Sequence, residues 1–351
     1  MRRVVIVGAG IVGLTCAWRL AREGARVTVL EADPDDLHVF RAAASGAAAG
    51  MLAPFDSESS AHSELALASF DLWRGELRPL LQESVRFEGA VIACASERDM
   101  AALQARVMSH GRRAAPLSRG QATRKLGFAI DHAISLADEG VADPLLSMDT
   151  LKLELRRLGV TLLHDQDVAS VSPHEARSYS GEVFEADRVV LAPGVWANAE
   201  LANAAPALRH VRPAKGHLVA VKPAKPLQTT LHAPGFYLTR RREDVVLGAT
   251  LQFDRYERNV EQAEVQKLLD AMEAVAPGAI QPAGRAWAGI RPMSPDGWPM
   301  IGESNGMLVA AGHSRNGWLL APITAEIINA YVFNMPIPPA WAALAPQRFE
   351  S

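Results

Sequence analysis

The most constraining stretch of the sequence lies near its amino terminus, where the apolar residues 4–7 lead into Gly8, Gly10 and Gly13 with G-x-G-x-x-G spacing. Four consecutive β-forming residues are typical of a strand buried on both faces, and the apolar spacing after them predicts a helix over residues 12–22. In such a strand–turn–helix unit, the first glycine permits the tight turn and the second lets a pyrophosphate approach the backbone. The third lets the helix pack closely on the sheet. The stretch therefore predicts a dinucleotide-binding βαβ unit.

A second apolar run, residues 26–30, is followed by Glu31. An acid at the end of the second strand of such a unit binds the ribose hydroxyls of the dinucleotide. Three glycines alone are weak evidence, because their spacing also arises by chance. The strand before them, the helix after them and Glu31 make the pattern specific. The alternative interpretation is an ordinary βαβ unit with a glycine-rich turn and a surface glutamate.

The pattern of the chain changes beyond residue 213. Short β-like runs over 216–222, 235–239 and 245–250 are separated by glycine and proline, as expected of an antiparallel sheet rather than of further βαβ units. Apolar periodicity also predicts helices over 63–81, 97–111, 144–159 and 260–276, and strands over 85–94, 160–163, 187–191 and 283–292. A chain of 351 residues exceeds one average domain. We therefore predict an α/β fold with a Rossmann-like dinucleotide domain and an antiparallel-sheet α+β domain.

Charge and cysteine content narrow the class of protein. The net charge of −3 gives no reason to expect nucleic acid or an anionic membrane as a partner. Cys16 and Cys94 lack the spacing and the neighbouring histidines of a metal site, so we expect no metal and a reducing, cytoplasmic setting. No apolar run approaches the roughly 18 residues of a membrane span. The sequence leaves the oligomeric state open, a homo-oligomer included.

An alanine-rich run covers residues 42–54. By composition it is either a linker or a helix, or a segment lying against a ligand. Gly46 and Gly50 would each cost a helix interior roughly 1 kcal/mol, which disfavours the helix. Small side chains suit a backbone that lies directly against a flat cofactor, and we favour that interpretation.

Three blocks, residues 44–54, 287–302 and 312–322, resemble the FAD-dependent amine and D-amino-acid oxidase superfamily. Within it they are most similar to the glycine oxidase branch associated with thiamine biosynthesis. With the glycine-rich turn, the resemblance covers nearly the whole chain in the right order. It implies a discontinuous FAD-binding domain, residues 1–81, 140–213 and 292–351, and a substrate-binding domain, residues 82–139 and 214–291. FAD is expected to be bound non-covalently, because neither cysteine falls in the flavin-facing blocks.

The resemblance also implies which residues bind FAD. The glycine turn receives the pyrophosphate and Glu31 the adenosine ribose, while the backbone of Val168 holds the adenine. The helix expected to begin near Pro322 directs preceding N–H groups at the flavin, where negative charge develops on reduction. The full expected set is Gly8, Ala9, Gly10, Ile11, Val12, Gly13, Glu31, Ser45, Ala48, Ala49, Gly50, Met51, Val168, Ala192, Gly194, Trp196, Arg291, Gly312, His313, Ser314, Arg315, Asn316, Gly317 and Trp318.

Three residues are expected to act on the substrate. Arg291 matches the family position that binds the substrate carboxylate, for which a planar pair of donors is suited; the alternative is a salt bridge at the domain junction. Tyr237 matches a tyrosine at the same carboxylate or at the pocket mouth, or is simple packing. Arg315 matches an arginine near the flavin and the entrance, or is structural. His313 is a candidate base by residue type, but the resemblance implies a structural role, because the matching position in the family is usually a structural loop residue.

The implied activity is oxidative deamination of glycine or a related small amine such as sarcosine or a small D-amino acid. A hydride passes from the α-carbon to flavin N5, and O2 is reduced to hydrogen peroxide. Ser314 and the neighbourhood of Gly235 depart from the glycine oxidase pattern, which puts glycine itself in question. The rival functions are a D-amino-acid dehydrogenase that passes electrons to a quinone, and a non-catalytic flavin- or dinucleotide-binding protein.

Overall fold

The computed structural model describes residues 1–35, 43–56, 60–242 and 244–349. Its first sheet has the strand order β20 (Met300–Ser304), β21 (Met307–Ala311), β13 (Arg188–Leu191), β1 (Arg3–Val7), β2 (Arg26–Leu30) and β9 (Thr161–Leu163). The pairs are parallel except for β20 with β21. The apolar run in β1 is explained by its central position, because both faces of that strand are covered.

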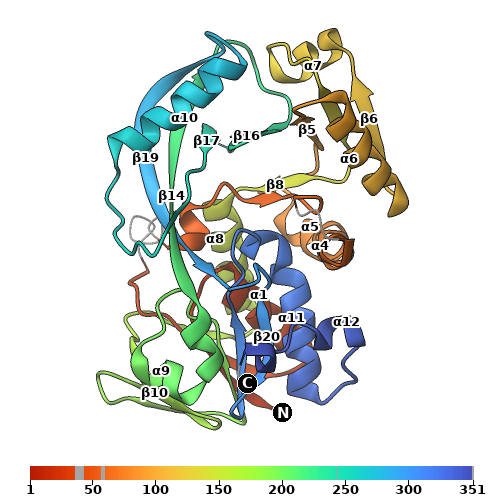
Figure 1. The fold of residues 1–351 in the computed structure, drawn as a ribbon. Coiled ribbons are helices and arrows are strands. Elements are labelled where there is room, and N and C mark those ends of the chain that lie inside the picture. The colour runs from red at the N-terminus through yellow and green to blue at the C-terminus, as the bar shows by residue number, and fades with distance from the viewer. Residues whose placement is uncertain (36–42, 57–59, 243, 350–351) are drawn as a thin grey trace.

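One face of this sheet packs on α1 (Ile11–Arg22), α8 (Pro144–Arg157) and α11 (Gly317–Phe333). The other packs on a small antiparallel sheet, β10 (Val168–Ser172), β11 (Glu175–Ser178) and β12 (Val183–Glu185), and on α9 (Ala199–Ala204). Figure 1 shows both chain termini in this lower part of the molecule. Shorter elements here are the 3-10 turns Pro206–His210 and Pro346–Phe349 and the helix α12 (Pro339–Ala342).

The second large sheet is built from β14 (Arg212–Pro223), β15 (Thr230–Ala233), β16 (Phe236–Arg240), β17 (Val245–Gly248), β18 (Gln252–Phe253), β19 (Ile280–Met293), β5 (Ala90–Ala93), β6 (Ala114–Leu117) and β7 (Ala133–Leu136). Its pairs are antiparallel, as predicted, except that β15 runs parallel to β5. The helices α6 (Glu97–Ser109), α7 (Arg119–Leu126) and α10 (Gln262–Val275) accompany it. The long strands β14 and β19 run from the lower part of the molecule into the upper part (Figure 1). They connect the lower part of the molecule to the upper part.

The alanine-rich run forms one helical turn, α3 (Ala44–Ala47), followed by β3 (Met51–Leu52) in a small sheet with β8 (Gly140–Ala142) and β4 (Val85–Arg86). The expectation that this run avoids helix was therefore wrong for Gly46. Gly50 has a φ of +75°, and a Cβ atom there would lie 1.9 Å from the carbonyl oxygen of Ala142. Glycine is needed at this position for the approach of β8, a tertiary reason that local composition does not show.

Most predicted helices agree with the structure. The predicted helix 63–81 is α4 (Ser60–Leu72), a π-helical turn (Trp73–Leu77) and α5 (Arg78–Leu81) in succession. The exception is the last block, where α11 begins at Gly317 and encloses Pro322, rather than beginning near that proline. Proline has no N–H for the carbonyl of Trp318, and the indole Nε1 of Trp73 donates to that carbonyl instead, at 3.0 Å. The hydroxyl of Ser69 accepts from Ile323 N and donates to Leu319 O, so α4 and the π-helical turn after it complete the hydrogen bonding around the proline.

Candidate active site

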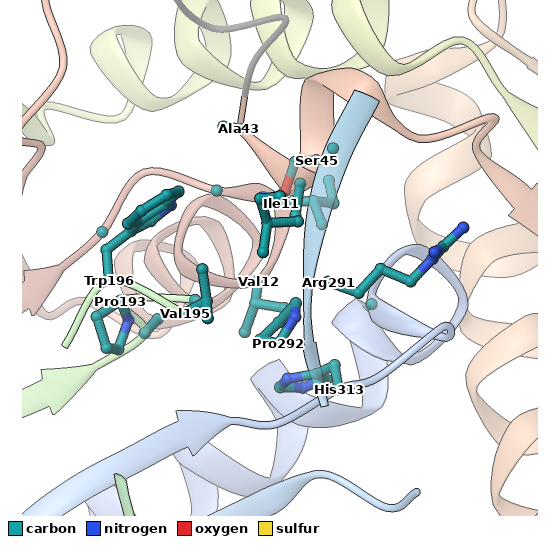
Figure 2. A pocket seen from close by; sticks show the side chains of 18 of the residues that line it. Ile11, Val12, Ala43, Ser45, Pro193, Val195, Trp196, Arg291, Pro292 and His313 are labelled. Atoms are coloured by element: carbon teal, nitrogen blue, oxygen red, sulfur yellow. The ribbon is translucent and has the colours of Figure 1, made fainter. Parts of the chain in front are cut away.

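A cavity of about 530 Å³ lies where β1, β2 and β13 end, and it continues between α11 and the strands β14 and β19. This is the position at which open parallel sheets bind ligands, because neighbouring connections diverge there. Every residue predicted to bind FAD or substrate lines the cavity except Ala9 and Gly13. Figure 2 shows Trp196 and Arg291 at opposite ends of the view, with Ile11 and Ser45 between them. The cavity is therefore elongated, as an extended dinucleotide requires.

The glycine-rich turn is closely packed. Gly8 has a φ of +105°, and a Cβ atom there would lie 2.3 Å from the carbonyl oxygen of Ala192. A Cβ atom at Gly13 would lie 2.0 Å from the carbonyl oxygen of Gly8, so Gly13 contributes the close helix packing rather than a cavity wall. Gly10 precedes α1 and has no side chain with which to cap it. The hydroxyl of Ser45 accepts from Ile11 N at 3.0 Å instead. The positive end of α1 faces the cavity, which suits a pyrophosphate.

Glu31 is held by backbone donors. Its Oε2 accepts from Ala9 N at 2.7 Å and its Oε1 from Asp33 N at 3.1 Å. Ala9 thus acts through Glu31 instead of lining the cavity. Each carboxylate oxygen has two acceptor sites, so the carboxylate can still accept hydrogen bonds from ribose hydroxyls. Further along, the carbonyl of Val168 accepts from Asn198 Nδ2 at 2.8 Å, which fixes the wall expected beside the adenine.

Three side chains hold the backbone of α3 and of Ala48, the residue after it. Trp318 Nε1 donates to Ser45 O at 3.1 Å, Trp287 Nε1 to Ala47 O at 2.9 Å and Arg241 Nη1 to Ala48 O at 3.4 Å. The backbone is thereby fixed from the outside, and its own small side chains leave the inner surface flat. A planar ring system fits against such a surface.

The amino terminus of α11 forms the facing wall. Asn316 precedes the helix without making a side-chain cap, and Asn316, Gly317 and Trp318 all line the cavity. The N–H groups of a first helical turn and the positive helix end stabilise negative charge placed there. The cavity is thus bordered by two helix amino termini, that of α1, where Ser45 accepts from Ile11 N, and that of α11, which has no side-chain cap. These features fit a flavin dinucleotide.

Arg291 projects from β19 at the far end of the cavity. Its Nη1 donates to Thr250 O at 3.1 Å, and within the described residues it forms no ion pair with a carboxylate. Burial lowers the pKa of its guanidinium, the nearby Tyr237 raises it and Arg315 lowers it. The alternative of a salt bridge at a domain junction thus finds no acidic partner in the described parts of the chain. A partly buried cation without a counter-ion favours an anionic ligand.

Tyr237 and Arg315 approach the same end of the cavity. The Tyr237 hydroxyl lies 2.7 Å from where a Cβ atom at Gly248 would be, and burial raises its pKa. Arg315 pairs with Asp56 at 3.3 Å, and 56% of its side chain is exposed. Their roles toward substrate stay predictions.

His313 is buried, and its Nε2 lies 2.9 Å from Thr324 Oγ1 in α11. Burial lowers the pKa of this imidazole to about 3, so it is neutral at physiological pH. A neutral ring hydrogen-bonded to the helix that follows it fits a structural role. Within the described residues no group of three or more His, Cys, Asp or Glu side chains is placed to hold a metal.

The structure adds residues that sequence reasoning missed. Arg258 and Asp56 line the cavity, and the guanidinium of Arg258 lies 5.1 Å from the Trp196 ring. Gly216 leaves room for Arg291, since a Cβ atom there would lie 2.2 Å from Nη1. Of these residues only Gly216 could have been noticed in the sequence, because a glycine inside a predicted strand often marks a place where another group approaches the backbone closely. The others depend on which loops the fold brings together.

Fold and site together define a dinucleotide-binding oxidoreductase, with a cavity that fits a flavin between a Rossmann-type sheet and an arginine-bearing mixed sheet. The chain belongs to the family described as FAD dependent oxidoreductase, which matches residues 3–331. FAD is therefore its cofactor. No helix in the described portion of the chain is both long and apolar enough to cross a membrane.

Relatives cover nearly the whole chain. The bifunctional protein ThiO/ThiG of Synechocystis sp. is 32% identical over 99% of this chain and 54% of its own length. The glycine oxidase of Geobacillus kaustophilus is 31% identical, covering 93% of this chain and 91% of the relative, and that of Bacillus subtilis is 30% identical over 96% and 94%. The chain thus spans about half of the bifunctional relative. The crystal structure of the Geobacillus glycine oxidase superposes with a TM-score of 0.85 at 28% identity, covering 99% of both chains.

Proposed function

We propose that the protein oxidatively deaminates glycine or a closely related small amine, with O2 as the final electron acceptor and hydrogen peroxide as product. The observation that carries the proposal is Arg291, a partly buried cation without a described acidic partner at the substrate end of an FAD cavity. Relatives named glycine oxidase, at about 30% identity, support the same substrate class. Bound FAD supplies the hydride acceptor.

The residues of the chain position the substrate. Arg291 holds the carboxylate through two parallel N–H donors, and Tyr237 bounds the space left for the α-carbon. No side-chain base is assigned, because the only histidine lining the described cavity, His313, is neutral and bonded to Thr324. The substrate amine therefore loses its proton to solvent before oxidation.

The finer assignments form part of this proposal. Residues 1–81, 140–213 and 292–351 form the FAD-binding domain, and residues 82–139 and 214–291 the substrate-binding domain. The two helix termini and Glu31 hold the cofactor as described above. A place in thiamine biosynthesis, which the resemblance implies, is supported by the bifunctional ThiO/ThiG relatives.

Arg291→Lys tests the carboxylate role. Lysine keeps the positive charge but cannot make the paired hydrogen bonds of a guanidinium. Losing charge-assisted bonds of roughly 1.5–3 kcal/mol each predicts at least a tenfold fall in kcat/KM, with FAD content unchanged. An amine without a carboxylate, such as ethylamine, is the control substrate. A lower melting temperature with unchanged kcat/KM would assign Arg291 to structure and make Arg315 the next candidate.

A peroxide-coupled screen of glycine, sarcosine and D-amino acids tests the reaction itself. Peroxide formed in proportion to substrate consumed supports an oxidase. Anaerobic bleaching of the flavin without aerobic peroxide would indicate a dehydrogenase that uses a quinone. A flavin spectrum that no amine bleaches would indicate a non-catalytic flavoprotein.

A further inference from the structure

Behind Arg291 lies a buried assembly that the reaction does not itself use. The carbonyl of Thr250 accepts from Arg291 Nη1 at 3.1 Å, while the hydroxyl of the same threonine lies 2.9 Å from both the backbone N and the Nδ1 of His217. His217 lies on β14 and is fully buried. Thr250 therefore connects the substrate arginine to a histidine on the neighbouring strand.

The hydrogen bonds fix the tautomer of His217. The backbone N of Glu261 can only donate, and it lies 3.2 Å from His217 Nε2, so Nε2 is the acceptor. The proton must then be on Nδ1, which donates to Thr250 Oγ1. Burial lowers the pKa of His217, the ammonium of Lys215 lowers it further, and the carboxylates of Glu261 and Glu264 raise it. A neutral imidazole agrees with the donor and acceptor assignment.

Charged residues anchor the far side of the assembly. The ammonium of Lys215, whose side chain is fully buried, donates to Glu261 Oε1 at 2.7 Å and to Asn259 Oδ1 at 3.2 Å. This contact lowers the pKa of Glu261 to about 2. The loop that carries Glu261 is thus tied to β14, and its backbone N–H is held against His217.

We infer that Thr250 and His217 are positioning residues for the substrate carboxylate, because His217 fixes the threonine hydroxyl and the threonine carbonyl in turn orients the guanidinium of Arg291. The inference rests on the proposed role of Arg291. It assigns the assembly to the binding of the carboxylate rather than to the chemical step.

The test is a matched pair of variants in the FAD-loaded enzyme. Thr250→Val replaces the hydroxyl by a methyl group and leaves two buried donors of His217 without an acceptor, whereas Thr250→Ser keeps the acceptor. Thr230→Val is the control, because it removes another buried hydroxyl bond of the same sheet, to Thr239 at 2.8 Å, away from Arg291. Acetate, a carboxylate with no amine to oxidise, is titrated against the flavin absorption spectrum, and KM and kcat for glycine are measured separately.

We expect Thr250→Val to raise both the acetate Kd and the glycine KM about tenfold with kcat within about twofold of wild type, a change of roughly 1.4 kcal/mol in binding. Thr250→Ser and Thr230→Val should stay near wild type. Unchanged Kd and KM in Thr250→Val, with or without a lower melting temperature, would overturn the inference.

Arg291→Lys separates this failure from failure of the proposed function. If it weakens acetate binding while Thr250→Val does not, the carboxylate role of Arg291 stands and the positioning role falls. If neither variant changes acetate binding, the carboxylate is held elsewhere and both fall. Should Thr250→Val not fold, His217→Leu removes the same donor, and we expect the same rise in Kd and KM, with His217→Asn restoring binding because its amide supplies an N–H near the Nδ1 position. Wild-type Kd and KM in His217→Leu would overturn the inference equally.

Discussion

We expect Gly216→Ala to displace the guanidinium of Arg291 by steric contact, while Arg291 itself is unchanged. A Cβ atom at Gly216 would lie 2.2 Å from Arg291 Nη1, 2.6 Å from Nη2 and 2.7 Å from Cζ, whereas ordinary contact begins at 3.4 Å. The guanidinium must therefore move by roughly 1 Å, which breaks its 3.1 Å bond to Thr250 O. The backbone of Gly216 does not have a left-handed φ, so alanine is tolerated there and the group that shifts is the end of a flexible side chain.

The expected effect follows from the bonds lost. Misplacing one charge-assisted hydrogen bond of roughly 1.5–3 kcal/mol predicts a fall of about ten- to 150-fold in kcat/KM for glycine. The assay is steady-state peroxide formation, with flavin content and melting temperature as checks on folding. Gly75→Ala is the control, because nothing lies within 4 Å of the added carbon. A kcat/KM for Gly216→Ala within about twofold of wild type would refute the reasoning, since it would mean that the position of Arg291 does not matter.

Three further predictions concern cofactor, pH and stability. Acid precipitation should leave the yellow colour in the supernatant, because FAD is bound non-covalently; colour in the pellet would contradict this. The rate constant for flavin reduction at saturating glycine should rise from neutral to alkaline pH, because the neutral amine is the reactant and no base is positioned; a flat profile from pH 6 to 10 would argue for a base. The folded-state pKa of His313, about 3, lies below its ordinary value near 6.5, so the stability it contributes is present above pH 6.5 and lost as the pH falls toward 3. His313 alone should thus lower the free energy of unfolding by about 2 kcal/mol between pH 7 and pH 5, and denaturant titration of His313→Gln should show a smaller loss than wild type over this range.

Sequence patterns correctly predicted the elements whose structure depends on residues adjacent in the chain. The strand, turn and helix around Gly8 follow from residues adjacent in sequence, and their bounds differ from the prediction by at most one residue. The start of α11 was wrong because Pro322 resembles a first helical residue, and nothing near it shows that Ser69 and Trp73 complete the interrupted bonding.

In the candidate site, the residues that lie in recognisable motifs were predictable from the sequence, and those placed by loop packing were not. Arg291 and Tyr237 could be proposed from their motifs, and the structure brings both to one cavity. Thr250 and Arg258 could not be found, because their places depend on how the loops after β17 pack against β14 and Trp196. The positions of these two residues are determined by contacts between segments that are distant in the sequence.

The proline inside α11 has a consequence for how this chain can have changed over time. Pro322 is tolerated because Trp73 and Ser69, distant in sequence, supply the missing hydrogen bonds. A proline arriving before these partners would have left the carbonyl of Trp318 unsatisfied in a buried helix, a cost of about 1–3 kcal/mol. The order of substitutions with the lower cost therefore has Ser69 and Trp73 in place before the proline. Once it was fixed, positions 69 and 73 lost much of their freedom to vary, so these three sites are expected to change together in descendants of the same ancestor.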